Sequence, residues 1–312
     1  MTRHPDGITA VDAEYVRPGL AAVHIVERSG RAAFVDTGTV PGVPRLLATL
    51  DALGIAREAV DYVFLTHVHL DHAGGAGALM QALPNAQAVL HPRGAPHVID
   101  PAKLIAGSIA VYGEDAYRRL YGEIVPIPAN RDIVTADSQR IALADRVFEL
   151  VHTPGHAMHH YSIVDCETAS IFPGDTFGIS YRELDTARGA FIVPTTTPTQ
   201  FDPDQLIASI VRLLSYRPKA LYLTHYSRVT DADRLAEQLT AQIRDFVAIA
   251  RRHAGAADRA TAIHEDMRLL WRRLAREHGC ALPDEEIDVL LGPDLTLNTQ
   301  GLIAWLDRTG KG

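Results

Sequence analysis

The most constraining stretch of the chain is residues 66–75, Thr-His-Val-His-Leu-Asp-His-Ala-Gly-Gly, which places three histidines and an aspartate within six positions. It follows the apolar run 62–65, which predicts a buried strand. Side chains at alternate positions of an extended chain share one side. We therefore expect His67 and His69 to bind one cation from the same direction, while Val68 points into the fold.

The other two polar side chains of this stretch, Asp71 and His72, come where Gly74 and Gly75 indicate a turn into a helix. They are expected to point at a second position a few ångströms away, so that one loop serves two metal ions. The alternative is a set of surface histidines beside an aspartate that caps a helix. That alternative suits a lone histidine, whereas the density of ligands favours metal binding.

Composition indicates a globular protein and narrows its partners. Of the 312 residues, 47% are hydrophobic and 22% charged, which is ordinary for a soluble protein with ample chain to bury a core. A net charge of −8 argues against a nucleic-acid or anionic-membrane surface. The N-terminal residues lack the apolar region of a signal peptide, and no apolar run is long enough to span a membrane. We expect a cytoplasmic protein without nucleic-acid or membrane partners, whose Cys166 and Cys280 are free thiols or form a single disulfide.

Strand and helix patterns recur in two halves of the chain. Short strands are predicted at residues 8–11, 20–27, 31–36, 60–65 and 88–91, with helices at 43–54 and 75–83. Further strands follow at residues 124–125, 133–134, 140–143, 147–152, 161–164 and 170–172. Two halves that each contain several strands predict two sheets packed face to face with helices outside.

Two helical regions stand apart from this pattern. Residues 101–121 carry Tyr112, Tyr117 and Tyr121, and they are interpreted as a packing helix, with a wall or lid over the site as the alternative. After residue 229 we predict helices at 230–252, 258–278, 285–291 and 298–306. The predicted domains are therefore 1–229, which carries the metal site, and 230–312, a helical extension. Plain packing anchored by Trp271 and Trp305 is preferred for this extension over a homodimer interface or a role at the substrate entrance.

Further ligand candidates stand where apolar runs stop. His156 ends the turn His-Thr-Pro-Gly-His, in which Pro-Gly fixes a tight geometry. Asp175 ends Phe-Pro-Gly-Asp, and His225 ends Leu-Tyr-Leu-Thr-His. Taken singly, His156 suits a turn and His225 a buried core, but together with the first loop they favour a dinuclear site.

The order His-x-His-x-Asp-His, Thr-Pro-Gly-His, Gly-Asp and a strand-terminal His resembles the metallo-β-lactamase superfamily of dinuclear metal hydrolases, over residues 8–225. The resemblance implies a four-layer αβ/βα sandwich, here with a C-terminal helical extension. It also implies one metal held by His67, His69 and His156, a second held by Asp71, His72 and His225, and Asp175 bridging both.

Several nearby residues are candidates for support or substrate contact. Asp36 ends a strand, and it either forms a turn or hydrogen-bonds the loop at residues 66–75, which we call the metal loop. His160 matches a histidine that in the family follows the Thr-Pro-Gly-His motif as a supporting group. The loop 176–200 carries Phe177, Tyr181 and the run Thr-Thr-Thr-Pro-Thr at 195–199. With Tyr226, this loop is expected to line a substrate pocket, the alternative being a long surface loop.

The chemistry follows from two cations roughly 3.5–4 Å apart, which can share one hydroxide as nucleophile. Asp71 is the candidate to orient that hydroxide and to pass its proton to the leaving group. Imidazole and carboxylate ligands suit zinc, iron or manganese alike. The resemblance puts zinc first, with iron or manganese as alternatives.

We therefore predict a dinuclear hydrolase of small molecules that cleaves a carboxylic ester, thioester or lactone, with phosphodiesters next. Within the family that the chain resembles, the Asp175 bridge argues against a true β-lactamase. His69 argues against the flavo-diiron oxidoreductase branch, which uses glutamate at that place. The alternatives are a non-catalytic, metal-dependent metabolite sensor or effector and an iron-dependent oxidoreductase.

Overall fold

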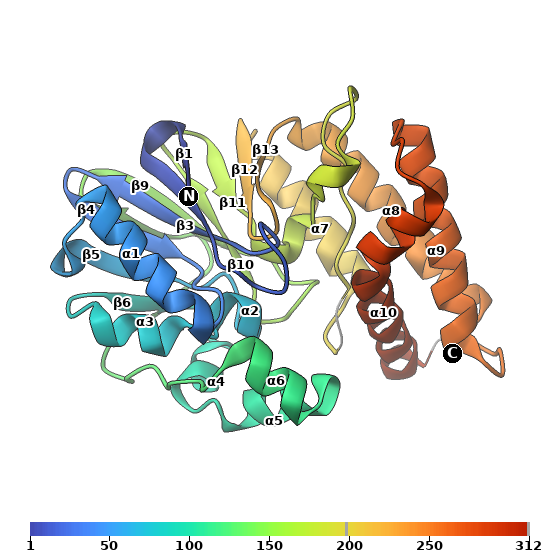
Figure 1. Ribbon diagram of the computed structural model, residues 1–312, viewed down its shortest axis with the longest axis horizontal. Helices are drawn as coiled ribbons and strands as arrows, with labels where there is room; N and C mark the ends of the chain where they lie inside the picture. Colours follow the sequence, from blue (N-terminus) through green and yellow to red (C-terminus); the bar gives the residue numbers. More distant parts are fainter. Residues whose placement is uncertain (197–198, 311–312) are drawn as a thin grey trace. The chain divides into compact units, whose positions relative to one another are not determined.

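The computed structural model of the protein describes residues 1–196 and 199–310 (Figure 1). Its chain divides into two compact units. Unit 1 comprises Met1–His152, His159–Gly174 and Pro218–Arg228, and unit 2 comprises Thr153–Met158, Asp175–Arg217 and Val229–Gly312. A compact unit need not fold by itself, so the division into domains 1–229 and 230–312 stays a prediction.

One sheet of unit 1 contains the N-terminal strands in sequence order, from β1 to β7. Neighbours from β1 to β4 are antiparallel, and those from β4 to β7 are parallel. Parallel strands end at the same edge of a sheet, so the chain leaves β4 and β5 side by side. The strands are β1 (Thr2–His4), β2 (Ile8–Asp12), β3 (Ala22–Arg28), β4 (Arg31–Val35), β5 (Val60–Phe64), β6 (Gln87–Leu90) and β7 (Asp132–Val134).

The other sheet has the order β13-β12-β11-β10-β9-β8. Strands β8 to β11 pair antiparallel, and β11 pairs parallel with β12. The strands are β8 (Gln139–Leu143), β9 (Arg146–His152), β10 (Tyr161–Asp165), β11 (Ser170–Phe172), β12 (Ala220–Leu223) and β13 (Ser227–Val229).

Two apolar cores hold unit 1 together. One lies between the sheets, where Phe64 and Phe148 have ring centroids 5.9 Å apart and Phe172 stacks on Tyr222. The other joins the first sheet to α1 (Val43–Leu53) and α3 (Ala76–Ala82) on its outer face (Figure 1). Helix α1 is amphipathic as predicted, and Gly54 ends it in the left-handed conformation that glycine adopts readily.

The segment predicted as one helix at 101–121 is two helices. Short α4 (Ala95–Ile99) precedes α5 (Ala102–Tyr112) and α6 (Glu114–Tyr121). Gly113, at φ 79°, separates the last two, because a positive φ cannot continue a right-handed helix. The strand predicted at 124–125 is wrong, since this short apolar pair forms no ladder. Ile124 packs instead beside Leu70 and α6.

Unit 2 contains the long helices of the C-terminal region: α7 (Pro203–Leu214), α8 (Ala232–Arg252), α9 (Arg259–His278) and α10 (Asp284–Thr309). The two short helices predicted at 285–291 and 298–306 are wrong as separate elements. They form one helix, α10, that continues through Pro293, because buried Leu291 and Leu295 on either side of it keep one continuous face packed.

The two tryptophans lie among these helices. The Trp271 indole N–H donates to Gln242 at 3.0 Å, and its ring packs on Phe246. The guanidinium of Arg251 lies 5.6 Å from the centre of the Trp305 ring. Both tryptophans thus serve packing within unit 2, and the homodimer stays a prediction.

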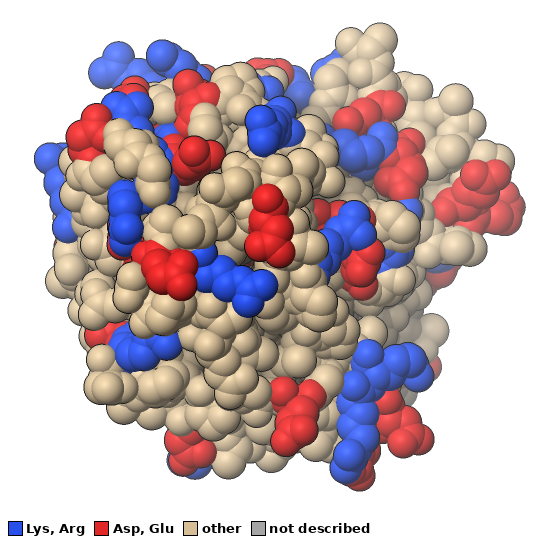
Figure 2. Space-filling view, turned by 60° about the vertical axis from the view of Figure 1, so that its left-hand side comes forward, with Lys and Arg blue, Asp and Glu red and all other residues tan. Residues whose placement is uncertain are grey.

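Surface charges are intermixed on the face that Figure 2 shows, with basic and acidic side chains next to each other. The ion pairs of the protein include Arg28 with Asp145 at 2.8 Å and Arg259 with Asp307 at 2.8 Å. Cys166 and Cys280 are free thiols. Within residues 1–196 and 199–310, no helix has both the length and the apolar character that a membrane span requires.

A pH-dependent contribution to stability is expected from His24, because burial lowers the pKa of its imidazole to about 3. Between about pH 6.5 and 3 the unfolded chain holds a proton on His24 that the folded protein lacks. The free energy of unfolding therefore decreases as the pH is lowered through this range, by up to about 1.4 kcal/mol per pH unit from this group. His24→Phe should flatten the dependence in urea titrations from pH 7 to 4, while His264→Phe should not. Equal slopes in the wild type and His24→Phe would contradict the assignment.

Candidate metal centre

The loop after β5 brings two predicted ligands together in unit 1. His67 Nε2 and His69 Nδ1 lie 2.9 Å apart, and His69 precedes the short helix α2 (Leu70–Ala73). This separation is close to the roughly 3.3 Å expected between two nitrogens that bind one tetrahedral zinc at about 2.0 Å each. Val68 is 2% exposed and belongs to the helix-side core. Alternation along the loop thus places the imidazoles on one side and the apolar side chain on the other.

A second group of donors lies in the same unit. Ligand atoms of Asp71, His72 and His225 all fall within 4.8 Å of one another. Asp71 Oδ2 is 3.6 Å from His72 Nε2 and 3.7 Å from His225 Nε2. His225 comes directly after β12, so chain segments about 150 positions apart meet at one place, as the sequence predicted.

The second nitrogen of each imidazole decides which nitrogen can bind a metal. His72 Nδ1 lies 2.9 Å from Asp36 Oδ2, and His225 Nδ1 lies 3.0 Å from the Leu20 carbonyl oxygen. A carboxylate or carbonyl oxygen only accepts, so both Nδ1 atoms donate. The lone pairs are then on the Nε2 atoms, which face Asp71. A ligand histidine that is oriented through its other nitrogen is typical of metal sites.

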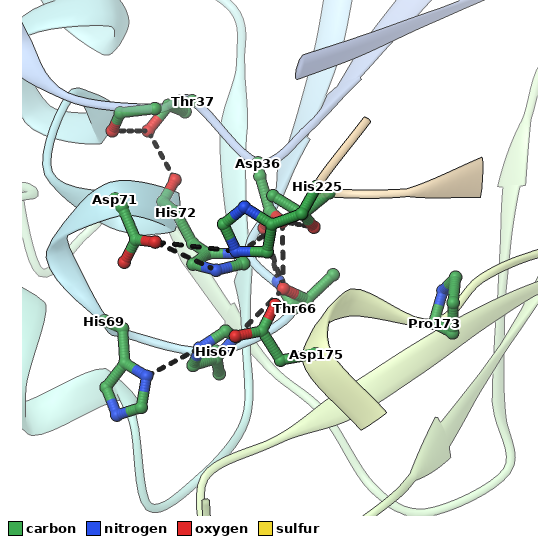
Figure 3. A network of polar contacts seen from close by, with 12 residues as sticks. Asp36, Thr37, Thr66, His67, His69, Asp71, His72, Pro173, Asp175 and His225 are labelled. Carbon is green, nitrogen blue, oxygen red and sulfur yellow. Dashed lines mark hydrogen bonds and ion pairs between the residues drawn. The ribbon is translucent and has the colours of Figure 1, made fainter. Parts of the chain in front are cut away.

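Asp36 is the centre of the polar network in Figure 3. Its buried carboxylate accepts from the Thr66 N–H at 2.9 Å, from the Thr66 hydroxyl at 3.0 Å, from His72 Nδ1 and from the Thr224 hydroxyl at 3.0 Å. Asp36 also has a left-handed φ of 58°. Both alternatives weighed for this residue therefore hold, since it turns the chain after β4 and supports the metal loop.

Helix α2 is fixed from the opposite side. The carbonyl oxygen of His72 accepts from the Thr37 N–H at 2.8 Å and from the Thr37 hydroxyl at 2.9 Å. Gly75 follows closely, where a Cβ atom would lie 3.0 Å from the Thr37 carbonyl oxygen. The glycine therefore allows the two chain segments to approach.

Two further histidines pack on the loop rather than join either donor group. His160 is fully buried and stacks on His67, with ring centroids 4.9 Å apart. His159 lies at 5.6 Å, edge to face, from His69, and its Nδ1 accepts weakly from the Val68 N–H at 3.5 Å. His160 thus packs on the loop, and its role as a supporting group stays a prediction, while His159 adds a second packing contact.

Two predicted ligands belong to unit 2. His156 Nε2 lies 3.4 Å from Asp175 Oδ2, and His156 Nδ1 lies 3.2 Å from the Thr195 carbonyl oxygen, to which it donates. The nitrogen of His156 that can bind a metal thus faces the carboxylate of Asp175. As for His72 and His225, Nδ1 of this imidazole donates to an oxygen atom and leaves Nε2 as the possible metal ligand.

Helix α7, which was not predicted from the sequence, holds the turn that presents His156. The Asp202 N–H donates to the Gly155 carbonyl at 2.8 Å, and the Ser209 hydroxyl donates to the Pro154 carbonyl at 2.7 Å. A Cβ at Gly155 would lie 2.3 Å from the backbone of Leu206. An N-capping Asp202 followed by Pro203 was the signal that could have found this helix.

The candidate pocket residues are mostly occupied in packing. Phe177 is fully buried, and the buried Tyr181 donates its hydroxyl to Asp294 of α10. Tyr226, at φ 69°, lies beneath the guanidinium of Arg17 at 5.9 Å. Their role in a substrate pocket stays a prediction. Within the predicted run 195–199, Thr197 and Pro198 lie outside the described residues.

The donor chemistry fits divalent metal ions. In the two groups of candidate ligands among the described residues, every ligand atom is an imidazole nitrogen or a carboxylate oxygen, which suits zinc, iron or manganese. The four imidazoles of His67, His72, His156 and His225 are each oriented through Nδ1, by a hydroxyl, a carboxylate or a carbonyl oxygen. Such preorganised donors are typical of a metal site.

A family model described as "Metallo-beta-lactamase superfamily" matches residues 16–225, about two thirds of the chain. The chain belongs to the metallo-β-lactamase superfamily. Similar solved structures include the metallo-β-lactamase family protein TTHA1429 from Thermus thermophilus, with a TM-score of 0.69 at 17% identity, covering 97% of this chain and 94% of that one. The predicted fold class, a metallo-β-lactamase sandwich with additional C-terminal helices, is confirmed.

Two curated relatives are similar in sequence. The metallo-β-lactamase fold-containing protein ST1585 of Sulfurisphaera tokodaii is 25% identical over 211 residues, which are 67% of this chain and 73% of that protein. A hydroxyacylglutathione hydrolase of Xanthomonas axonopodis pv. citri is 28% identical over 187 residues, which are 60% of this chain and 54% of the hydrolase.

Asp36→Asn is expected to weaken metal binding more than folding. The substitution keeps the shape of the side chain but replaces a carboxylate oxygen by an amide, so one of its donors loses its acceptor. Zinc affinity should fall by about 10- to 100-fold, as for other losses of a ligand's supporting group. Competition with a fluorescent zinc chelator measures this, with exposed Asp51→Asn as control. Unchanged affinity in Asp36→Asn would show that the network does not support the ligands.

Gly174→Ala tests the packing of His160 beside the loop. A Cβ there would lie 2.5 Å from His160 Nε2, and φ is 51°. Overpacking and backbone strain together should lower the free energy of unfolding by about 2–4 kcal/mol. Gly30→Ala is the matched control, because Gly30 has φ 74° but nothing within 4 Å of the added Cβ. Urea unfolding should show the smaller loss for Gly30→Ala, and equal losses would count against steric contact with His160.

Proposed function

We propose that this protein is a metal-dependent hydrolase that cleaves ester-like bonds of small molecules, with thioesters, carboxylic esters and lactones ahead of phosphodiesters. One observation carries the proposal. Asp71, His72 and His225 converge with both imidazoles held in the metal-binding tautomer by Asp36 and by the Leu20 carbonyl. A surface cluster of histidines has no reason to be oriented in this way.

The proposed ligand sets follow the family order. His67, His69 and His156 would hold one ion, Asp71, His72 and His225 the other, and Asp175 both. Chain connectivity supports this assignment. His156 follows His152, the last residue of β9, by four positions, which limits the separation of their Cα atoms to about 14 Å. Asp175 is bonded to Gly174, whose added Cβ would lie 2.9 Å from Thr66 in the metal loop.

When bound, two divalent cations supply Lewis acidity and lower the pKa of water toward neutrality. Nitrogen and oxygen donors without thiolate suit zinc, iron and manganese. We put zinc first because the resemblance to the superfamily implies it.

Asp71 has the role of orienting the attacking water and moving its proton to the leaving group. The Asp71 side chain is 21% exposed, against 0% for His72 and 6% for His225. It is therefore the member of its group that solvent and substrate can reach. A carboxylate with one oxygen directed at the histidines keeps the other oxygen for a proton.

The similarity to a hydroxyacylglutathione hydrolase supports a thioester as the first substrate to test, although the chain spans about half of that enzyme. We further propose that the protein acts in the cytoplasm, in keeping with its free thiols.

The test is hydrolysis by purified protein that has been stripped with a chelator and reloaded with zinc, manganese or iron(II). The panel contains a glutathione thioester, aryl and alkyl esters, a lactone and bis(p-nitrophenyl) phosphate. Metal-dependent turnover of at least one substrate is expected, together with its loss after chelation. If no metal form hydrolyses any member, the proposal fails, and an intact ester bound to the loaded protein would then favour the sensor alternative.

Asp175→Asn extends the test to the bridging position. It should lower kcat/KM by at least about 100-fold, or about 2.7 kcal/mol of transition-state stabilisation, and reduce the metal content. Circular dichroism should show a retained fold. Asp204→Asn, in the first turn of α7, is the control and should keep activity and metal. Full metal content in an inactive Asp175→Asn protein would contradict the bridging role.

A further inference from the structure

A pair of tyrosines lies beside the metal loop in unit 1. Tyr15 comes from the loop between β2 and β3, and Tyr121 ends helix α6. Their hydroxyl oxygens are 3.0 Å apart, and their rings stack with centroids 6.0 Å apart. Tyr15 was not named from the sequence, and Tyr121 was named only among the tyrosines of the segment 101–121. Their pairing could not be predicted, because 106 positions separate them.

The apolar surroundings of the pair connect it to the metal loop. Tyr121 and Tyr117 form a buried cluster with Leu70, the residue before Asp71, and Tyr15 packs against this cluster. Burial raises the pKa of the Tyr15 and Tyr121 hydroxyls well above their ordinary range, and the negative charge of Asp71 adds to the effect. Both phenols are therefore protonated at neutral pH and lie within electrostatic reach of the Asp71 carboxylate.

Hydrogen-bond accounting favours one direction of the bond between the two hydroxyls. Tyr121 is 2% exposed, whereas Tyr15 is partly exposed. If Tyr15 donated, the buried Tyr121 proton would need another acceptor, and an unsatisfied buried donor is unfavourable. Either hydroxyl can donate in this contact, and donation by Tyr121 is the direction that satisfies the more buried side chain. In that direction the proton of the Tyr15 hydroxyl is left for another acceptor.

The loop that carries Tyr15 also orients a proposed ligand. The Ala13 N–H donates to the Ala21 carbonyl at 2.8 Å, which closes the loop, and within it the Leu20 carbonyl accepts from His225. Glu14 and Val16, the neighbours of Tyr15, have φ values of 56° and 58°. A β-branched residue rarely adopts this conformation, and such residues are concentrated where a side chain must be held for function.

We propose that Tyr15 donates a hydrogen bond to an oxygen atom of the substrate bound beside Asp71, and that Tyr121 positions Tyr15 for this contact. The inference rests on the proposed hydrolase function and deepens it. A phenol that stays protonated recognises an acceptor, so the substrate class is one with a carbonyl or phosphoryl oxygen. The helices α5 and α6 are then part of the site through Tyr121, in addition to packing on Leu70.

The experiment compares Tyr15→Phe, Tyr121→Phe and the double variant with the wild type, all loaded with zinc. Tyr117→Phe is the matched control, because Tyr117 lies on the same helix and in the same apolar cluster. Four quantities are measured: kcat and KM for the best substrate, zinc content, thermal unfolding, and the affinity for methylphosphonate by calorimetry. Methylphosphonate presents tetrahedral oxygens without being hydrolysed.

Tyr15→Phe should lower kcat by about 10- to 100-fold and weaken methylphosphonate binding by about tenfold, with zinc content unchanged. Tyr121→Phe should have a smaller effect on kcat and none in the Tyr15→Phe background, because a positioning residue acts only through its partner. Tyr117→Phe should match the wild type in kcat and in methylphosphonate affinity.

Three results would overturn the inference: a wild-type kcat in Tyr15→Phe, equal losses in all three single variants, or a loss of zinc that parallels the loss of activity. A wild-type protein that hydrolyses nothing defeats the proposed function instead. In that case the methylphosphonate measurement decides on Tyr15, and equal affinity of wild type and Tyr15→Phe, undetectable binding included, overturns the inference.

Discussion

A buried carboxylate is stable in a protein only when hydrogen-bond donors replace the water it has lost, and Asp36 satisfies this condition with donors from two separate chain segments. Thr66 begins the metal loop, His72 belongs to α2, and Thr224 precedes His225. Each of these buried donors would also lack an acceptor without the carboxylate. The ends of β4, β5 and β12 are therefore held together by the residue that also orients a proposed ligand.

The sheets determine where such a network can exist. Parallel pairing of β4 with β5 brings the ends of these strands to one edge, and the chain turns there before it enters a helix. Asp36 and the loop from Thr66 to His69 occupy this edge. The spacing of ligands that follow strand ends is set by the hydrogen-bonded strands, which are held more rigidly than a loop. The apolar core between the sheets thus contributes to the site by fixing the strands from which the ligands emerge.

Much of this arrangement was predictable from local pattern. Alternation after an apolar run predicted the shared side of His67 and His69, and residue order in the motifs predicted the fold. What failed depended on tertiary context. Helix α10 continues through Pro293 because buried leucines flank the proline on both sides, and residues 101–121 break where Gly113 takes a positive φ. The role of Asp36 was left open because one of its donors, Thr224, lies 188 positions away. The contact of His225 with the Leu20 carbonyl has no sequence signature, since any residue has a carbonyl.

That last contact separates two tasks that one loop performs. The backbone of Leu20 orients His225, while side chains of the same loop, such as Tyr15 and the exposed Val16, are directed elsewhere. A substitution of the exposed Val16 can therefore change the surface of this loop without removing the backbone atom that holds the imidazole. The loop thus combines a backbone contact that is independent of side-chain identity with side chains that are open to change.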